Sequence, residues 1–293
     1  MREDDLRESS NVEDRRGMSG AGKGGLGIGA IVVLTLIGWA TGINPAALIG
    51  GAEQVQQTIN PQQQTAQQGR QGAPTDEMGQ FVAKILGETE DVWSKQLPAE
   101  MGTKYVAPVL VLYSGQTQSG CGSAQSAMGP FYCPLDQKLY LDTAFFNDMK
   151  TKMGGGGDFA YAYVIAHEVG HHVQNLIGLL PKVQAAEKQA DQQGDKAEAN
   201  NLSVRTELMA DCLAGAWANH MNQRHDNLTD ADLQQAVNTA TAIGDDRLSR
   251  ASGRAAVPDS FTHGSSAQRV KWLSTGFRAG TVGACNTYQG SNP

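Results

Sequence analysis

Charged, polar and apolar residues are unevenly distributed along this chain, and their pattern divides it into segments. The first clear segment is Gly25 to Ile43, nineteen residues without a charge. A helix of this length spans the hydrocarbon core of a bilayer, which is about 30 Å thick. Arg15, Arg16 and Lys23 lie shortly before this run, and the next basic residue, Arg70, comes well after it. The pattern predicts a transmembrane anchor at residues 25–43.

The same charge asymmetry predicts the orientation of the anchor. Basic residues remain on the cytoplasmic side, so residues 1–24 are expected to be a cytoplasmic segment and the rest of the chain extracytoplasmic. Two alternatives are a cleaved signal peptide, which has a shorter lead, and a buried core helix, which shows a polar stripe. The lead here is long and mixed in charge, and the run has no polar stripe. The uncleaved anchor is therefore the favoured interpretation.

Residues 44–74 are rich in Gln and contain few large apolar residues to bury, which predicts a flexible tether. A folded domain is expected over residues 75–293. Its first helix is predicted to start with Thr75 or Asp76 as the N-cap and to end before Pro98. One side of this helix is apolar and supplies residues for a core.

The middle of the chain has the pattern of a small sheet. Tyr105 to Tyr113 has the β-branched character of a buried strand. Gly129 to Asp142 reads as two short strands around a Pro-Leu-Asp-Gln turn, which predicts a β-hairpin. From Asp158 onward the pattern is helical, and Gly178 is expected to stop the first of these helices. The expected fold is an α+β domain, with a mainly helical core and a small antiparallel sheet from residues 105 to 142.

Composition narrows the possible partners. Hydrophobic residues make up 40% of the chain and charged residues 18%, so most of it can bury a core. The formal net charge is −7, and Lys and Arg form no long cluster. These features exclude a nucleic-acid-binding surface.

Four cysteines are present, Cys121, Cys133, Cys212 and Cys285. They allow three disulfide pairings, and the sequence does not choose among them. A disulfide could close the short Gly- and Ser-rich loop between Cys121 and Cys133, which would leave Cys212 with Cys285. An extracytoplasmic location favours disulfides, and the alternative is four free thiols. The spacing does not match a zinc site made of cysteines.

The segment Tyr161 to Gly178 contains an HExxH motif, His167-Glu168-Val169-Gly170-His171. On a helix, residues four apart share a face, so His167 and His171 can reach one metal ion. Glu168 can then reach a water molecule at the open coordination position. A chance match to the motif is expected only about 0.005 times in a chain of this composition. The motif predicts a zinc-dependent hydrolase.

A tetrahedral zinc site needs a third protein ligand. Glu207 and Asp211 lie four residues apart in the largely apolar stretch Ser203 to Trp217. Glu207 is predicted to bind the metal, and Asp211 to accept the outer N–H of a ligating histidine. The alternative is an ordinary exposed acidic face, which the apolar neighbours make less favourable.

His263 is a further candidate for the chemistry. It precedes a predicted helix that is capped by Ser265 or Ser266 and carries Arg269. A histidine in this place could donate a hydrogen bond to an oxyanion, and the alternative is a loop histidine without a role. His172, next to the motif, points away from the metal and is expected to be structural or to line the rim of the site.

These residues resemble those of the gluzincin metallopeptidases, the thermolysin-type clan. The resemblance rests on the HExxH motif together with Glu207 and Asp211 as an ExxxD pair on a later helix. It implies one zinc ion bound by the two motif histidines and Glu207. The longer metzincin pattern is absent, because Gln174 and Ile177 stand where that pattern requires Gly and His.

Two further stretches resemble membrane-bound gluzincins such as the HtpX and CAAX-prenyl peptidases. Residues 129–142 correspond to a hairpin whose edge strand binds substrate in those proteins. The stretch from Thr262 corresponds to their Thr-His-Pro…Arg segment, with Gly264 in place of the proline. This resemblance implies that His263 stabilises the transition state and that Arg269 helps to hold the site together.

Over nearly its whole length the chain resembles the bacterial putative neutral zinc metallopeptidase family, the YpfJ-like proteins. The basic lead, the apolar run, the Gln-rich tether and the stretches GPFYCP, HEVGHHVQN and ELMADC all fit this family. The resemblance implies zinc and peptide hydrolysis but supplies no substrate. With the predicted anchor and its orientation, the expected location is the inner membrane, with the catalytic domain in the periplasm.

The expected chemistry is hydrolysis of a peptide or protein substrate. Glu168 would take a proton from the attacking water and return it to the leaving amine, while an edge strand near Phe131 holds an extended peptide. Two other functions remain open, a zinc-fold scaffold without turnover and a hydrolase of cell-wall peptide amides. The presence of Glu168 argues against the scaffold.

Overall fold

The computed structural model describes residues 1–17, 69–153, 155–251, 253 and 255–289. The chain divides into two units, Met1–Asp14 with Gln71–Pro293, and Arg15–Arg70. The predicted anchor at residues 25–43 and most of the predicted tether lie outside the described residues. Within the described part of the chain, no helix is both long enough and apolar enough to pass through a membrane.

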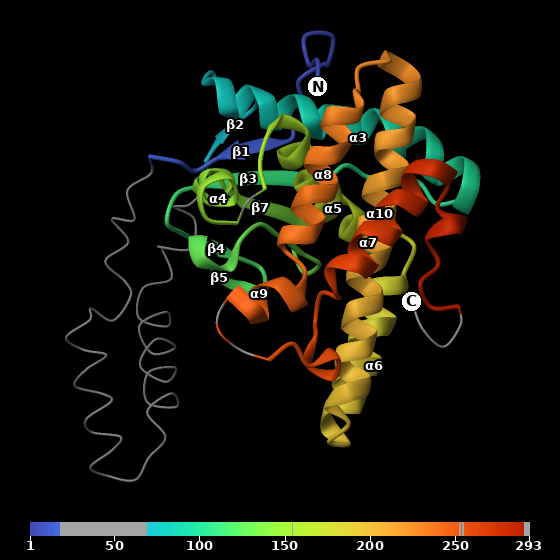
Figure 1. Ribbon diagram of the computed structural model, residues 1–293. Coiled ribbons are helices and arrows are strands. Elements are labelled where there is room, and N and C mark those ends of the chain that lie inside the picture. The colour runs from blue at the N-terminus through green and yellow to red at the C-terminus, as the bar shows by residue number, and fades with distance from the viewer. Residues whose placement is uncertain (18–68, 154, 252, 254, 290–293) are drawn as a thin grey trace, which may run out of the picture. The chain divides into compact units, whose positions relative to one another are not determined.

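Figure 1 shows the order and arrangement of the elements. The strands are β1 (Val12–Asp14), β2 (Arg70–Gln71), β3 (Val109–Tyr113), β4 (Gln116–Ser119), β5 (Gly122–Gln125), β6 (Phe131–Cys133) and β7 (Lys138–Asp142). The α-helices are α3 (Glu77–Met101), α4 (Ala144–Asp148), α5 (Asp158–Leu176), α6 (Leu179–Gln192), α7 (Lys196–His225), α8 (Asp230–Ala242), α9 (Asp245–Ala251) and α10 (Ser266–Ala279). Short helical turns are η2 (Ser126–Met128), η3 (Met149–Met153), η4 (Pro258–Ser260) and η5 (Gly283–Cys285).

The main sheet is mixed, with five strands in the order β2-β1-β3-β7-β6. The predicted hairpin is confirmed, since β6 and β7 are antiparallel and joined by the turn at residues 134–137. The expectation of one small antiparallel sheet holds for the separate pair β4–β5 but not for the main sheet, where β1 and β7 both run parallel to β3. Strand β1 was not expected because it comes from the N-terminal segment, whose polar sequence gives no strand pattern. Strand β7 can run parallel to β3 because β4, β5 and β6 lie between them in the chain and provide the long connection that a parallel pair needs.

The two faces of the main sheet are buried in different ways. Successive side chains of a strand point to opposite faces. One face packs on the helices and joins the main core through Leu110, Leu112, Tyr132, Leu139 and Leu141. The other face forms a smaller core with Ala124 of β5 and includes Val111, Tyr113, Phe131, Cys133 and Tyr140. Strand β6 therefore lies between the helical layer and the β4–β5 hairpin.

Helix α3 starts as predicted and ends later than predicted. Asp76 is the N-cap and accepts a hydrogen bond from the backbone N–H of Gly79 at 3.0 Å. The expected end before Pro98 is wrong, because the helix continues to Met101. A proline removes the hydrogen bond to the carbonyl four residues earlier, here that of Ser94, which is exposed and can be hydrated instead.

The helices that carry the candidate site pack with unusually close backbones. Helix α5 starts and stops where the pattern predicts, at Asp158 and just before Gly178. Where it crosses α7, a Cβ on Gly170 would lie 3.0 Å from the carbonyl oxygen of Ala210. On the other side of α7, a Cβ on Gly276 of α10 would lie 1.8 Å from the carbonyl oxygen of Cys212. Two glycines therefore let α5 and α10 contact α7 directly, and Figure 1 shows α10 alongside α7.

The N-terminal segment Met1–Asp14 belongs to the same compact unit as the helices. The sequence pattern instead assigned residues 1–24 to a separate segment and began the folded domain at residue 75. In the structure, Leu6 and Val12 are 6% and 0% exposed and belong to the main core. Two apolar residues among many charges give no amphipathic period, so the sequence pattern does not indicate that this segment is part of the fold. Backbone pairing with β3 holds the segment as much as its side chains do.

Both predicted candidates for cysteine pairing are disulfides. Cys121 is bonded to Cys133, which joins the β4–β5 turn to strand β6. Cys212 is bonded to Cys285, which joins α7 to the C-terminal turn η5. No described cysteine is free.

Candidate metal centre and active site

Three side chains from α5 and α7 converge on one point. His167 Nε2 lies 3.1 Å from Glu207 Oε2, and His171 Nε2 lies 3.4 Å from Glu207 Oε1. One ligand atom from each of the three residues lies within 4.8 Å of the other two. Tetrahedral zinc with bonds of about 2.0–2.1 Å holds its ligand atoms roughly 3.4 Å apart. The donor set and its spacing fit a zinc ion.

The ring of His167 is oriented by a buried carboxylate. Its Nδ1 lies 2.9 Å from Oδ1 of Asp211, which leaves Nε2 directed at Glu207. Arg269 donates to both oxygens of Asp211, from Nε at 2.8 Å and from Nη2 at 2.9 Å. The hydroxyl of Tyr163 donates to the same carboxylate at 2.5 Å. Sequence reasoning placed Asp211 and Arg269 at the site and missed Tyr163, although it lies one helical turn before His167.

The charge of Asp211 is maintained despite its full burial. Burial raises the pKa of a carboxyl, but the Arg269 guanidinium and the hydrogen bond with His167 outweigh it and lower the pKa of Asp211 to about 2. The carboxylate is therefore charged at neutral pH. It is a fixed acceptor for the imidazole N–H, as a partner of a metal-binding histidine must be.

The second histidine is oriented by a residue that sequence reasoning did not assign. His171 Nδ1 lies 2.9 Å from the amide oxygen of Gln174, whose Nε2 donates to the carbonyl of Thr206 at 2.7 Å. Because a carbonyl only accepts, the Gln174 amide has one orientation, and its oxygen faces the imidazole N–H. Nε2 of His171 is then free for the metal. The i, i+3 spacing from His171 is the sequence signal for this role.

In the absence of metal, these residues hold a proton tightly. Burial opposes the charged form of His167, but its hydrogen bonds with Asp211 and Glu207 raise its pKa to about 10. Burial likewise opposes the Glu207 carboxylate, yet the two histidines hold its pKa well below the usual range. Metal binding to this set therefore competes with a proton.

The three candidate metal ligands line a cavity of about 590 Å³ that is also lined by residues of β6 and α6. Glu168 opens onto this cavity and is 9% exposed. Its carboxylate makes no hydrogen bond to any of the described residues. It can therefore accept a proton from a water molecule in the cavity.

His263 lines the same cavity from the loop before α10. Its backbone N–H donates to Oδ2 of Asp245 at 2.6 Å, and its Nδ1 lies 3.5 Å from Oδ1 of the same carboxylate. The hydrogen bond to Asp245 raises the pKa of His263 against the effect of burial. Gly264 has a φ of +91°, which proline cannot adopt, so this loop differs from the Thr-His-Pro segment that it resembles.

The sequence profile described as "Putative neutral zinc metallopeptidase" matches residues 1–288. The chain belongs to this family. It is 46% identical to the uncharacterized protein YpfJ of Escherichia coli (strain K12) over 301 aligned residues, 98% of this chain and 99% of the relative. It is 40% identical to the uncharacterized protein Mb2605 of Mycobacterium bovis over 76% of this chain and 75% of that relative. No solved structure matches the chain.

Membership of this zinc metallopeptidase family agrees with the geometry of the three candidate ligands. It supports hydrolysis as the class of reaction and a peptide or protein as the class of substrate. The names of the relatives specify no substrate, so specificity has to be inferred from the cavity itself.

Proposed function

We propose that this protein is a zinc-dependent endopeptidase. The observation that carries the proposal is the convergence of His167, His171 and Glu207 at one point of a cavity that the Glu168 carboxylate also lines. Bound zinc polarises a carbonyl and lowers the pKa of water toward neutrality. Asp211 and Gln174 hold the two imidazoles with Nε2 toward the metal position.

The remaining groups of the cavity have complementary tasks in this proposal. Glu168 takes the proton of the attacking water and returns it to the leaving amine. His263, beside Asp245, donates a hydrogen bond to the oxyanion that develops from the scissile carbonyl. An extended peptide lies along the open edge of β6, which lines the cavity.

The proposed location is an oxidising compartment outside the cytoplasm. Two disulfides support it, because such bonds persist where thiols are not kept reduced. The apolar run at residues 25–43 would attach the domain to the inner membrane, with the catalytic domain in the periplasm.

The first test is the zinc content of the purified full-length protein, compared with the Glu207→Ala variant. We expect about one zinc per chain in the wild type and its loss in the variant, since two histidines alone leave a structural ligand missing. Glu187→Ala is the matched control, because Glu187 lines the same cavity from α6 without belonging to the ligand group. It should retain zinc.

Hydrolysis completes this test. The zinc-loaded protein should cleave an unfolded protein such as casein, stop when a chelator removes the metal, and recover when zinc is returned. Zinc retained by Glu207→Ala would show that the third ligand is wrong. Cleavage of cell-wall muropeptides but not of casein would replace the endopeptidase with a cell-wall amide hydrolase, and zinc binding without any cleavage would favour a scaffold.

A further inference from the structure

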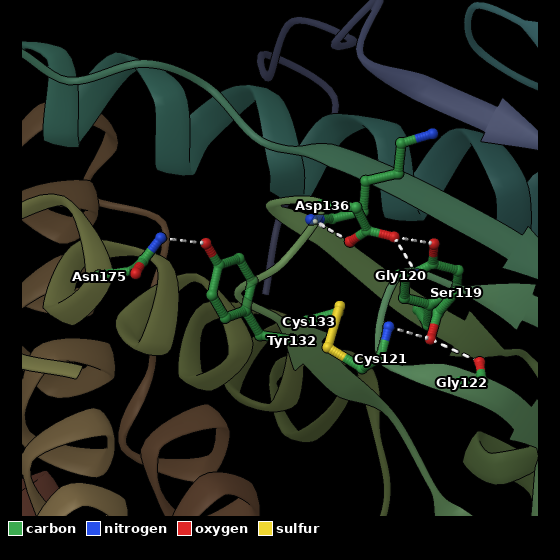
Figure 2. Close-up of a disulfide and its surroundings, with 10 residues drawn as sticks. Ser119, Gly120, Cys121, Gly122, Tyr132, Cys133, Asp136 and Asn175 are labelled. Carbon is green, nitrogen blue, oxygen red and sulfur yellow. Dashed lines mark hydrogen bonds between the residues drawn. A yellow bond between two sulfur atoms is a disulfide. The ribbon is translucent and has the colours of Figure 1, made fainter. Parts of the chain in front are cut away.

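Two polar residues of α5 do not face the metal position. His172 and Asn175 lie three residues apart and therefore on one side of the helix. Both reach the hydroxyl of Tyr132 in strand β6, from His172 Nδ1 at 3.0 Å and from Asn175 Nδ2 at 3.0 Å. Figure 2 shows Tyr132 directed at Asn175.

These hydrogen bonds have only one possible direction. His172 Nε2 lies 2.6 Å from the carbonyl oxygen of Val106, and because a carbonyl only accepts, Nε2 carries the hydrogen. In the neutral ring Nδ1 must then accept, so the hydroxyl of Tyr132 donates to it. The oxygen of Tyr132 in turn accepts from the Asn175 amide. His172 is 0% and Tyr132 8% exposed, so removal of one group leaves a buried partner unsatisfied.

The opposite face of β6 is held as well. Cys133, the residue after Tyr132, is bonded to Cys121 in the β4–β5 turn. Figure 2 shows this disulfide and the Tyr132 ring extending from β6 in different directions. Phe131 stacks on Tyr140 of β7 with ring centroids 5.0 Å apart. Strand β6 is thus fixed between α5 and the β4–β5 hairpin.

The outer edge of β6 is the end of the main sheet and pairs with no other described strand. Residues of this strand line the same cavity as His167, Glu168 and His171. A peptide that adds to such an edge takes its register from the backbone groups of the strand. A displacement of about 1 Å in the strand would therefore move the scissile bond relative to Glu168.

We propose that Tyr132, His172 and Asn175 form a strand clamp that holds β6 in register with the metal-binding helix and so selects which bond of an extended peptide is cleaved. The proposal rests on the proposed function. The three side chains are positioning residues, because their polar groups bond to each other and to Val106. The same helix would then hold the metal with one face and the substrate strand with another.

Tyr132→Phe is the direct test, because it removes one hydroxyl and retains the ring. In the full-length zinc-loaded protein we expect an increase in KM of about tenfold for peptides that extend across the site. The variant leaves His172 Nδ1 and the Asn175 amide without their buried partner, and a loss of this kind has an effect of about this size. We also expect cleavage at neighbouring bonds, read by mass spectrometry of the products. The kcat for a short reporter peptide and the zinc content should remain close to those of the wild type.

Tyr140→Phe is the matched control. It removes a hydroxyl from the adjacent strand, where Tyr140 donates to Asp136 at 2.7 Å and belongs to the smaller core on the other face of the sheet. Its cleavage pattern should equal that of the wild type. A Tyr132→Phe enzyme with unchanged cleavage positions and KM would overturn the positioning role.

Hydrogen exchange separates the failure of this proposal from the failure of the proposed function. Tyr132→Phe should accelerate amide exchange in residues 129–134, and Tyr140→Phe should not do so to the same extent. Unchanged exchange in Tyr132→Phe would disprove the strand clamp whether or not the wild type is a peptidase. Absence of any hydrolysis by the wild type, with accelerated exchange in Tyr132→Phe, would retain the clamp and refute its role in cleavage.

A separate inference comes from the N-terminal segment, which is built into the fold by several hydrogen bonds. The N–H of Ser9 donates to Ala83 and that of Leu110 donates to Asn11, both at 2.9 Å. The buried carboxylate of Glu90 accepts from the side chains of Ser9 and Asn11 at 2.5 and 2.8 Å. The profile of the family also starts at residue 1.

The chain leaves this unit after Asp14 and re-enters it at Gln71. The N–H of Gly72 donates to the carbonyl of Val12 at 2.9 Å, so the re-entering chain lies beside the strand that it left. We infer that the N-terminal segment and the catalytic cavity lie on the same side of the membrane. Asp14 and Gln71, which belong to one folded unit, would then both lie on the side of the catalytic cavity. This inference is an alternative to the single crossing expected from residues 25–43, and the experiment below distinguishes the two.

Single cysteines introduced at exposed positions of the full-length protein test this topology. Glu8→Cys reports on the N-terminal segment and Lys95→Cys on α3, and both residues are exposed. In intact membranes, a maleimide that cannot cross the bilayer should label both variants or neither, and after lysis it should label both. Labelling of one variant alone before lysis would overturn the inference and restore the single crossing.

Discussion

Glu168→Gln is expected to lower the rate of peptide hydrolysis by about 10²–10⁴-fold, the usual contribution of general acid–base catalysis. The substitution preserves the size of the side chain and its place on the cavity wall, but the amide cannot accept the proton of the attacking water. Glu168 belongs to no group of ligand atoms at the metal position, so the zinc content should remain that of the wild type. Steady-state rates and metal analysis of the same preparation check both statements.

Glu187→Gln is the matched control for this prediction. It introduces the same chemical change into another carboxylate of the same cavity and should reduce the rate far less. If Glu168→Gln retains most of the wild-type rate at full zinc occupancy, another group must be the general base. If the zinc content falls with the rate, Glu168 contributes to metal binding and the assignment of ligands has to be revised.

Asp211→Ala is expected to lower the free energy of unfolding by about 3–5 kcal/mol, the range for removal of one partner of a buried ion pair. Arg269 is 3% exposed and makes two of its hydrogen bonds to Asp211. The alanine variant leaves this guanidinium buried without its counter-ion, and His167 loses the acceptor for its Nδ1. Urea unfolding of the protein with its disulfides intact measures the change.

A double variant distinguishes the stability of this ion pair from its role in metal binding. Asp211→Leu combined with Arg269→Met replaces both charges by apolar groups, which commonly restores stability. The zinc affinity should still be about 10–100-fold weaker than that of the wild type, because the acceptor for His167 is missing. Full recovery of the zinc affinity would show that Asp211 acts only through stability.

The pH dependence of this contribution follows from the sign of the shift. The pKa of Asp211 is lowered to about 2 in the folded protein, below its value of about 3.9 in an unfolded chain. The stabilisation is therefore fully present above pH 4 and is lost as the pH falls toward 2. Asp211→Ala should remove this part of the acid dependence of unfolding.

The geometry gives a task to each polar residue of the stretch from His167 to Asn175. His167, Glu168 and His171 face the cavity, and Gln174 orients His171. The two remaining residues bond to Tyr132 of β6. In this proposal the HEVGHHVQN stretch has a second role besides metal binding, since it also fixes the position of a strand at the cavity.

Part of the fold followed from local pattern alone. The Asp76 cap, the hairpin at residues 129–142 and the limits of α5 depend on neighbours in sequence, and the structure has them as predicted. The predicted end of α3 before Pro98 was wrong, because the exposure of Ser94 lets the helix continue through the proline. The parallel pairing of β1 with β3 joins residues about a hundred positions apart, and no local period encodes such a contact.

By itself, the sequence determined which helix carries two of the candidate metal ligands and the class of chemistry that they suggest. Two histidines four residues apart share a face of any α-helix, so the metal-binding pair and the adjacent carboxylate follow from helical geometry. Only the tertiary structure decided which distant groups complete the site. Gly170 and Gly276 let α5 and α10 approach α7, so that Glu207 and Asp211 meet the histidines and Arg269 meets Asp211. The orientation of Gln174, the contact of Tyr132 with α5 and the insertion of residues 1–14 depend on packing between segments, which a one-dimensional pattern does not record.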